Sequence, residues 1–308
     1  MKRLALSLLL ALGVAPYLLP DYYVFLLAKA LIMAIYAMGF TLLFGYTGLL
    51  SFGHAAYFAI GAYMSAIMIA RLGIDELLLV LPASVGAATL YALLVGVLTV
   101  RHTAIFFAIL TLAFAQVVYA LIYKLYDLTG GSDGIWGVRI PKLLGVELSA
   151  GHAYYFLVLS TFLASYLLLW RLTGSPFGKC LEALRESVIR AELVGINVKL
   201  YRLVAFLISG AYAGLAGALF APLNGHVGPE VAYWTFSGDV VFMSILGGHR
   251  VLPGPVVGAV IYVFLKNFVT SVTIYWLIVL GSTLIVLTLA FPYGVTGTLL
   301  KLLRRWFK

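Results

Sequence analysis

Residues 22–44 read YYVFLLAKALIMAIYAMGFTLLF, with Lys29 as the single charged side chain. A helix of this length extends about 34 Å, enough to cross the roughly 30 Å hydrocarbon core of a bilayer. An apolar run of more than about 18 residues is typical of a transmembrane helix. This segment therefore predicts that the chain crosses a membrane.

The composition of the whole chain agrees with this segment. Hydrophobic residues make up 64% of its 308 residues and charged residues 10%, whereas soluble domains average about 45–50% and about 25%. Mean hydropathy is +1.09. A water-soluble globule of this size could not hide so much apolar surface. We therefore predict an integral membrane protein and exclude a folded soluble domain of ordinary size.

Further apolar runs follow the first one. They cover approximately 49–70, 77–99, 103–123, 152–170, 203–223, 236–248, 254–268 and 273–291. With an N-terminal stretch that ends at Pro20, they predict an all-α, polytopic fold of about ten (8–10) transmembrane helices in a single domain, residues 1–308. The run at 236–248 is too short to span comfortably, so we expect it to be re-entrant, or tilted and broken.

The N-terminal stretch has two interpretations. Lys2 and Arg3, followed by an apolar run, are typical of a secretory signal peptide, and Ala11-Leu12-Gly13 offers a weak cleavage site. A retained first span is favoured, because a cytoplasmic Lys2-Arg3 start agrees with the charge distribution along the rest of the chain.

The net charge of +9 indicates contacts with the membrane surface and not nucleic-acid binding, because the basic residues fall mainly in connections between apolar runs. With ten spans, one side receives fourteen Lys and Arg residues and the other receives six. The positive-inside rule then places both termini and residues 171–202 in the cytoplasm, and the loop 126–151 outside. The expected location is the plasma (cytoplasmic) membrane, with lipid as the surrounding partner.

The sequence lacks the patterns that carry enzyme chemistry. Cys180 is the single cysteine, and the five histidines show no metal-ligand spacing, so no metal site is expected. The segment GSPFGKC (174–180) superficially resembles a P-loop, but it has three residues between its glycines instead of four, and Cys where Ser or Thr is required. No nucleophile, base or metal cluster is apparent within the spans. We predict that the chain is not an enzyme and has no nucleotide site.

The most charged stretch, 171–202, contains a predicted helix from Ser175 to Gly195. Ser175 suits an N-cap and Gly195 a helix end. Apolar residues recur at helical spacing on one face, and the other faces carry charges, including Glu186 and Arg190 as an i,i+4 pair. Such a helix is a membrane-surface helix, a solvated connector or a knob that docks into a soluble partner.

A glycine-rich stretch at membrane depth precedes His54. Irregular backbone at this depth is tolerated only where it is buried in protein or lines a wet cavity. The stretch is therefore a translocation path or gate element, or a place where helices pack closely through small residues. The candidate path or gate residues are Gly48, Ser51, Gly53, His54 and Gln116.

His54 is the sharpest single candidate, because a lone histidine in an apolar run is costly and usually faces the bundle interior. It is expected to hydrogen-bond a neighbouring helix or to contact substrate. Asp239 and Lys266 are further candidates, either in the interior or at the outer interface, where charge is less costly. The glycine spacings at 210–214 and 254–258 predict close helix packing.

Several motifs, in this order, resemble those of one membrane-protein family. They are GYTGLLSFGHAAYFAIGAY (45–63), FFAILTLAFAQVVY (106–119), TGGSDG (129–134), RAELVGINVKLYRLVAFLISGAYAGLAGAL (190–219), LGGHRVLPGPVVGAV (246–260) and FPYGVTG (291–297). They are similar to the M-type permease subunit of branched-chain amino acid ABC importers, over residues 40 to 300. His249-Arg250 departs from the family's usual Gly-Gly-x-Gly, which predicts a bulkier turn.

The resemblance implies a type II ABC importer-like permease for Leu, Ile or Val. It also implies a sister permease, two cytoplasmic ATPase subunits that carry ATP and Mg²⁺, and an extracytoplasmic substrate-binding protein, with no cofactor on this chain. Residues 171–202 would be the coupling segment and 126–151 an extracytoplasmic loop. The residues expected to enter a groove of the ATPase are Arg185, Glu186, Arg190, Glu192, Gly195 and Asn197.

Other cargoes and mechanisms stay open. Related permeases carry urea or short amides, and no residue in the sequence identifies the cargo. A self-sufficient ion-coupled secondary transporter would require paired intramembrane acids or a proton relay, for which Asp239 is the one candidate.

Overall fold

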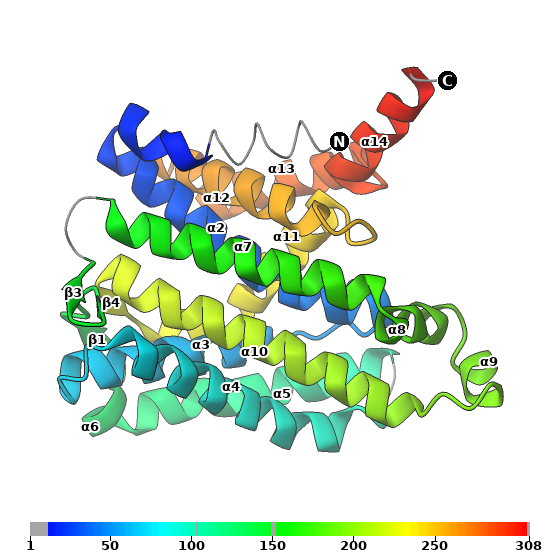
Figure 1. The fold of residues 1–308 in the computed structure, drawn as a ribbon, viewed down its shortest axis with the longest axis horizontal. Coiled ribbons are helices and arrows are strands. Elements are labelled where there is room, and N and C mark those ends of the chain that lie inside the picture. The colour runs from blue at the N-terminus through cyan, green and yellow to red at the C-terminus, as the bar shows by residue number, and fades with distance from the viewer. Residues whose placement is uncertain (1–11, 103, 149–151, 307–308) are drawn as a thin grey trace.

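The computed structural model describes residues 12–102, 104–148 and 152–306. Most of the long helices lie side by side along one direction (Figure 1). Within the described residues, seven segments are long and apolar enough to cross a bilayer. They are α2 (Asp21–Thr47), α4 (Leu77–Thr99), α5 (Ala104–Lys124), α7 (Ala153–Gly174), α10 (Val198–Asn224), α12 (Gly254–Val272) and a last segment, Trp276–Leu299, made of α13 (Trp276–Ala290) and the start of α14 (Gly294–Trp306).

Helices α2 and α10 form the centre of the bundle. Their most apolar windows are 89% and 67% buried, whereas those of α4 and α5 are 28% buried. α2 is apolar around its whole circumference, as expected for a helix surrounded by protein, and Tyr36, Phe40 and Leu42 are fully enclosed. The outer spans therefore place one side against the centre and leave the other side exposed at the surface of the bundle.

The two ends of the bundle differ (Figure 1). At one end, β1 (Ile135–Trp136) pairs antiparallel with β4 (His226–Val227), and β2 (Lys142–Leu143) with β3 (Val146–Glu147); the loop that holds β1 to β3 begins with the short helix α6 (Tyr126–Thr129). At the other end lie α8 (Pro176–Glu186) and α9 (Val188–Leu193). We call these ends the strand face and the α8–α9 face.

Two apolar runs form helices that start inside the bundle. α3 (His54–Ala66), extended by a π-helical turn η1 (Ile67–Arg71), begins beside the middle of α10. α11 (Trp234–Gly247) has 14 residues and reaches only about 21 Å. The shortness predicted for 236–248 is confirmed. The span predicted at 49–70 is helical only from His54, because residues 48–53 enter the bundle without helical structure.

Small residues bring helices into backbone contact at both places predicted from glycine spacing. A methyl group on Gly61 would overlap the backbone of Gly214 where α3 packs on α10, and one on Gly258 would overlap the carbonyl of Met243 where α12 packs on α11. Such close approach is typical of helix packing in membranes, where small residues let two backbones touch.

The all-α polytopic fold is confirmed. Among the described residues, the seven long segments together with α3 and α11 make up the bundle. The prediction for the N-terminal stretch falls mainly on residues 1–11, which lie outside the described residues; residues 12–18 are helical.

Candidate functional site

The N-terminal ends of α3 and α11 meet in the middle of the bundle. The backbone N–H of Ala55, in the first turn of α3, donates to Ser237 Oγ of α11 at 2.8 Å. The ring of Phe236 stacks on Tyr36 of α2 with 5.8 Å between centroids and lies 4.8 Å from the ring of Phe58. We call this meeting point, formed by these residues and His54, the junction.

From the junction the two helices run toward opposite faces. Arg71, at the end of η1, donates to the carbonyl of Asp127 on the strand face. Ser244, near the end of α11, shares a hydrogen bond with Thr41 of α2 (2.8 Å between the Oγ atoms), and the loop after α11 reaches α8 through His249. In transporters built from inverted repeats, half-helices that start near the bilayer midplane form the cargo site, with their free N–H groups toward the cargo.

His54 is fully buried at the start of α3. Its Nε2 lies 2.6 Å from Ser209 Oγ of α10, and that hydroxyl donates its one proton to the carbonyl of Gly39 at 2.6 Å. Ser209 must therefore accept from His54, so Nε2 carries the imidazole proton and Nδ1 is an acceptor. Nδ1 has no hydrogen-bond partner within the described residues. Of the two predicted roles, the structure shows the bond to a neighbouring helix.

The other predicted path residues lie in the link before α3 and on α5. Gly48 ends α2 with a left-handed φ of 76°. Ser51 is fully buried, and its hydroxyl accepts from the N–H of Gly53 at 3.3 Å. A side chain at Gly53 would overlap the carbonyl of Thr111. Gln116 lies on α5, where its Nε2 is buried and has no partner in the described part of the chain.

The helix predicted from Ser175 to Gly195 is two helices. Its backbone breaks at Ser187 (φ −163°, ψ 113°), whose Oγ accepts from the N–H of Arg190 at 3.3 Å and caps α9. The prediction of an uninterrupted helix is wrong, because the Ser187 side chain offers the backbone a local alternative to the helical hydrogen bond. The predicted pair Glu186 and Arg190 is divided between α8 and α9.

The predicted ATPase contacts on this segment are mostly exposed. Glu186, Arg190 and Glu192 project from the end of α8 and from α9. Gly195 turns the chain after α9 with a φ of 87°, and the side chain of Asn197 caps α10. These side chains are free to meet a partner that approaches the α8–α9 face.

The sequence analysis did not predict the exposed apolar side chains at the end of α9. Ile189, Leu193 and Val194 are 72%, 81% and 76% exposed, whereas Leu181 and Leu184 of the predicted apolar face are buried against the bundle. The sequence did contain a signal for this surface, because the predicted helix carries apolar residues on two faces and the bundle can bury only one. Exposed apolar side chains that lie together mark an interaction site. We call Ile189, Leu193 and Val194 the α9 tip.

Arg185 points into the permease and joins α8 to the end of α2. Its guanidinium donates to the carbonyl of Gly45, in the last turn of α2, and to His249 Nε2 at 3.2 Å. A cation at a helix C-terminus is favourable, because the last carbonyls have no helical partner. The bulkier side chain predicted at His249 takes part in this contact, and its ring lies 4.9 Å from that of Phe44.

His249 makes this contact sensitive to pH. Burial, reinforced by the charges of Arg185 and Arg250, lowers the pKa of His249 from 6.5 to about 4. The unfolded chain therefore binds this proton below about pH 6.5, and the folded chain only below about pH 4. We expect stability to fall as the pH drops through this window, measured as the midpoint of thermal unfolding. His249→Gln, which keeps an acceptor, should flatten the profile there; an unaltered profile would contradict this assignment.

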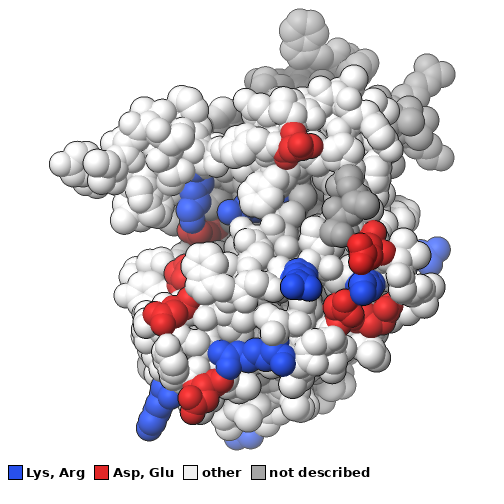
Figure 2. All heavy atoms as spheres, turned by 90° about the vertical axis from the view of Figure 1, so that its left-hand side faces the viewer, with Lys and Arg blue, Asp and Glu red and all other residues white. Residues whose placement is uncertain are grey.

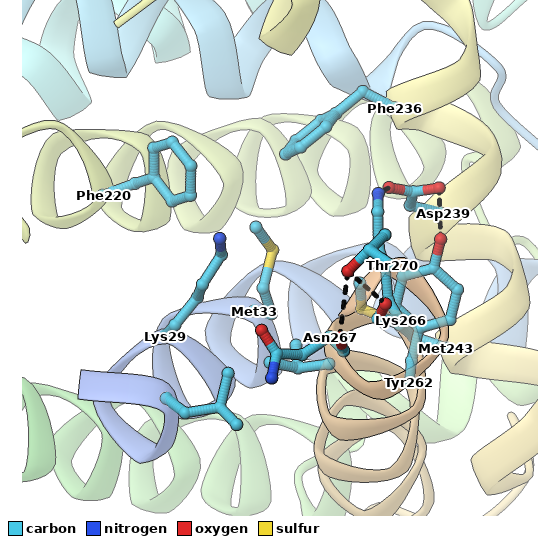
Figure 3. Close-up of a pocket in the computed structure, with 12 residues that line it drawn as sticks. Lys29, Met33, Phe220, Phe236, Asp239, Met243, Tyr262, Lys266, Asn267 and Thr270 are labelled. Carbon is cyan, nitrogen blue, oxygen red and sulfur yellow. Dashed lines mark hydrogen bonds and ion pairs between the residues drawn. The ribbon is translucent and has the colours of Figure 1, made fainter. Parts of the chain in front are cut away.

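The predicted candidates Asp239 and Lys266 form an ion pair between α11 and α12. Lys266 Nζ lies 2.7 Å from Asp239 Oδ2, and Tyr262 OH donates to Oδ1 at 2.5 Å. Lys29 of α2 lines the same cavity (Figure 3). Its isolation in the first apolar run is the sequence signal of a functional position. Within the ranges that the structure describes, no three His, Cys, Asp or Glu side chains lie close enough to hold a metal ion.

Comparison with known proteins identifies a family. Residues 22–288 match the family described as branched-chain amino acid transport system / permease component. The chain is 30% identical to the high-affinity branched-chain amino acid transport system permease protein LivM of Salmonella typhimurium and 29% identical to LivM of Escherichia coli K12, in both cases over 96% of this chain and 75% of the relative. It is 28% identical to LivH of Escherichia coli K12, over 86% of this chain and 91% of the relative. No solved structure matches the chain.

The matched range contains the junction, α3, α11, residues 171–202 and the cavity around Lys29. The LivM relatives match almost the whole chain, whereas LivH matches less of it. The resemblance to the M-type subunit is thereby confirmed. The chain belongs to the family of permease components of branched-chain amino acid transport systems.

Proposed function

We propose that this chain is the permease subunit of an ATP-driven importer of branched-chain amino acids. The observation that carries the proposal is the α9 tip: apolar side chains exposed beyond the spans, on a segment that Arg185 ties to the end of α2. Such a surface requires a partner, and a preformed short helix transmits a partner's movement without first having to fold. The names of the relatives supply the cargo class, Leu, Ile and Val.

In this proposal, two ATPase subunits dock on the α8–α9 face and carry the ATP and Mg²⁺. A sister permease completes the translocation path past the junction, and a substrate-binding protein docks on the strand face. Helices α3 and α11 are the elements that change position during transport, because they start inside the bundle and their other ends lie at opposite faces.

Charge supports the orientation of the chain in the plasma membrane. Arg171, Lys179, Arg190 and Lys199 lie exposed at the α8–α9 face, while the loop 126–151 carries more balanced charge. An excess of Lys and Arg favours the cytoplasmic side. The α8–α9 face is then cytoplasmic, together with both termini, and the strand face is extracytoplasmic.

The test is ATP-dependent leucine uptake by vesicles that contain this chain with the candidate sister permease, ATPase subunits and binding protein. Leu193→Asp places a charge on the α9 tip, and Leu144→Asp is the matched control, because Leu144 is 77% exposed on the strand face. We expect the purified complex of Leu193→Asp to have lost the ATPase subunits and to show no uptake. The complex of Leu144→Asp should retain the ATPase subunits.

Two results would overturn the proposal. One is leucine uptake by this chain alone, driven by an ion gradient and indifferent to ATP. The other is a wild-type complex that imports urea or a short amide but no branched-chain amino acid.

A further inference from the structure

A cavity of about 290 Å³ lies between α2, α10, α11 and α12 (Figure 3). Phe236, which packs on Tyr36 at the junction, forms part of its wall. A wider opening of about 870 Å³ continues from it past Glu230 and Trp234. Figure 2, which looks onto the strand face, shows a hollow in which basic and acidic side chains come together. The cavity therefore connects the junction with the strand face.

The charged side chains in this cavity are not all paired. Each carboxylate oxygen of Asp239 has one partner, Lys266 at Oδ2 and Tyr262 at Oδ1. Lys29 approaches from the opposite wall (Figure 3), where its Nζ lies 5.7 Å from the centre of the Phe220 ring. No carboxylate of the described residues lies within ion-pair distance of Lys29. Lys29 therefore has no ion-pair partner of its own among these residues, and an unpaired lysine within a bundle of membrane-spanning helices is a candidate functional residue.

An α-amino acid with an apolar side chain matches this arrangement. Its carboxylate can form a charge-assisted hydrogen bond with Lys29, and its ammonium group one with Asp239, whose oxygens have lone pairs beyond those used by Lys266 and Tyr262. The rings of Phe220 and Phe236 offer an apolar surface for the side chain. A volume of about 290 Å³ lies just below the roughly 300–1,000 Å³ typical of sites for drug-sized molecules. The volume therefore suits a ligand as small as a single amino acid.

We infer that this cavity is an amino-acid-binding site within the permease, in which Lys29 binds the carboxylate and Asp239 the ammonium group of the cargo. The inference rests on the proposed function for its ligand class. It adds a binding site for the cargo on this chain itself. The site lies on the strand-face side of the junction, which the cargo reaches before it passes α3 and α11.

The test is equilibrium binding of radiolabelled leucine to the assembled transporter in lipid nanodiscs, without the substrate-binding protein. We expect saturable binding by the wild type and about tenfold weaker binding by Lys29→Met. Lys29→Arg, which keeps the charge, should restore binding to within about threefold of the wild type. Lys124→Met is the matched control, because Lys124 is exposed at the end of α5 and should leave binding unchanged.

Asp239→Asn separates recognition from structural support. Leucine binding should weaken about tenfold in this variant, whereas binding of 4-methylpentanoate, which has the same carboxylate and side chain but no ammonium group, should not weaken. An equal loss for both ligands would show that Asp239 acts only on the structure of the cavity and would overturn its assignment.

Leucine binding that is equal in Lys29→Met and the wild type would overturn the inference, as would the absence of wild-type binding at millimolar leucine. ATP-driven leucine uptake on the same preparations tests the proposed function separately. If wild-type uptake is intact and leucine binding is unchanged in Lys29→Met, only the proposed binding site is refuted. Wild-type complexes that assemble but show no ATP-driven uptake refute both. Size-exclusion chromatography with the ATPase subunits confirms that each variant assembles.

Discussion

Gly217→Ala is expected to leave little folded permease in the membrane, whereas Gly86→Ala is expected to leave the yield unchanged. A methyl group at Gly217 would overlap the carbonyl of Phe58 and lie 2.8 Å from the backbone nitrogen of Ala62. Backbone atoms of α3 cannot move aside as a flexible side chain can, so α3 would have to separate from α10. The same contact holds the hydrogen bond from Ser65 to the carbonyl of Ala218 (3.1 Å).

The expected cost is large because overpacking a well-packed core costs about 1–3 kcal/mol even where side chains can rearrange, out of a total stability of about 5–15 kcal/mol. Gly86 has no atom within 4 Å of the added methyl group, and both changes gain the same helix propensity of about 1 kcal/mol. The measurement is the fraction of monodisperse protein after extraction and its thermal unfolding midpoint. Equal midpoints for the two variants would show that α3 and α10 are not packed as described.

Arg185→Ala is expected to uncouple ATP hydrolysis from transport in the assembled complex. Arg185 connects α8 to the carbonyl of Gly45 and to His249, and hydrogen bonds to charged groups are each worth about 1.5–3 kcal/mol. Because the side chain is only partly buried, the lower value applies, which still corresponds to about tenfold in an equilibrium. Leucine uptake should fall at least about tenfold while ATP hydrolysis continues.

Two further variants define this result. Arg185→Lys should recover part of the uptake, because a point charge cannot reproduce the planar fork that meets both acceptors. Lys199→Ala, at an exposed position at the start of α10, should behave as the wild type. If uptake and ATP hydrolysis declined in parallel in Arg185→Ala, the residue would serve docking of the ATPase and not transmission within the permease.

The fold class could be predicted from the sequence because apolar length and charge placement reflect the bilayer directly. The start of α3 could not. Residues 49–53 are largely apolar, LLSFG, and hydropathy does not distinguish helical from extended backbone. The structure accommodates this extended link through contacts distant in sequence, such as that of Gly53 with Thr111 on α5. Local sequence carries no record of such contacts.

The candidate site was predictable where the relevant residues are neighbours in the chain and not where they come together from distant helices. His54 stands out in its own run, and a hydrogen bond to a neighbouring helix was one expectation for it, whereas its partner Ser209, 155 positions away, could not be predicted. Lys29 and Asp239 become members of one cavity only when α2 lies beside α11 and α12. The helix break at Ser187 could not be predicted, because the helical spacing of apolar residues continues across it, from Leu184 to Ala191.

The start of α3 inside the bundle also dictates the order in which the protein can be made. Ser65 and its hydrogen-bond acceptor Ala218 are 153 positions apart, so a ribosome finishes α3 long before it begins the second half of α10. Until then the residues 48–53 have no α10 beside the helix they lead into, and lipid offers their exposed amides no hydrogen bonds. The nascent chain must keep this stretch in a watery or chaperoned environment while α4, α5 and α7 are synthesised. The contacts at the start of α3 are complete only after α10 and then α11, whose Ser237 accepts from Ala55, have been synthesised.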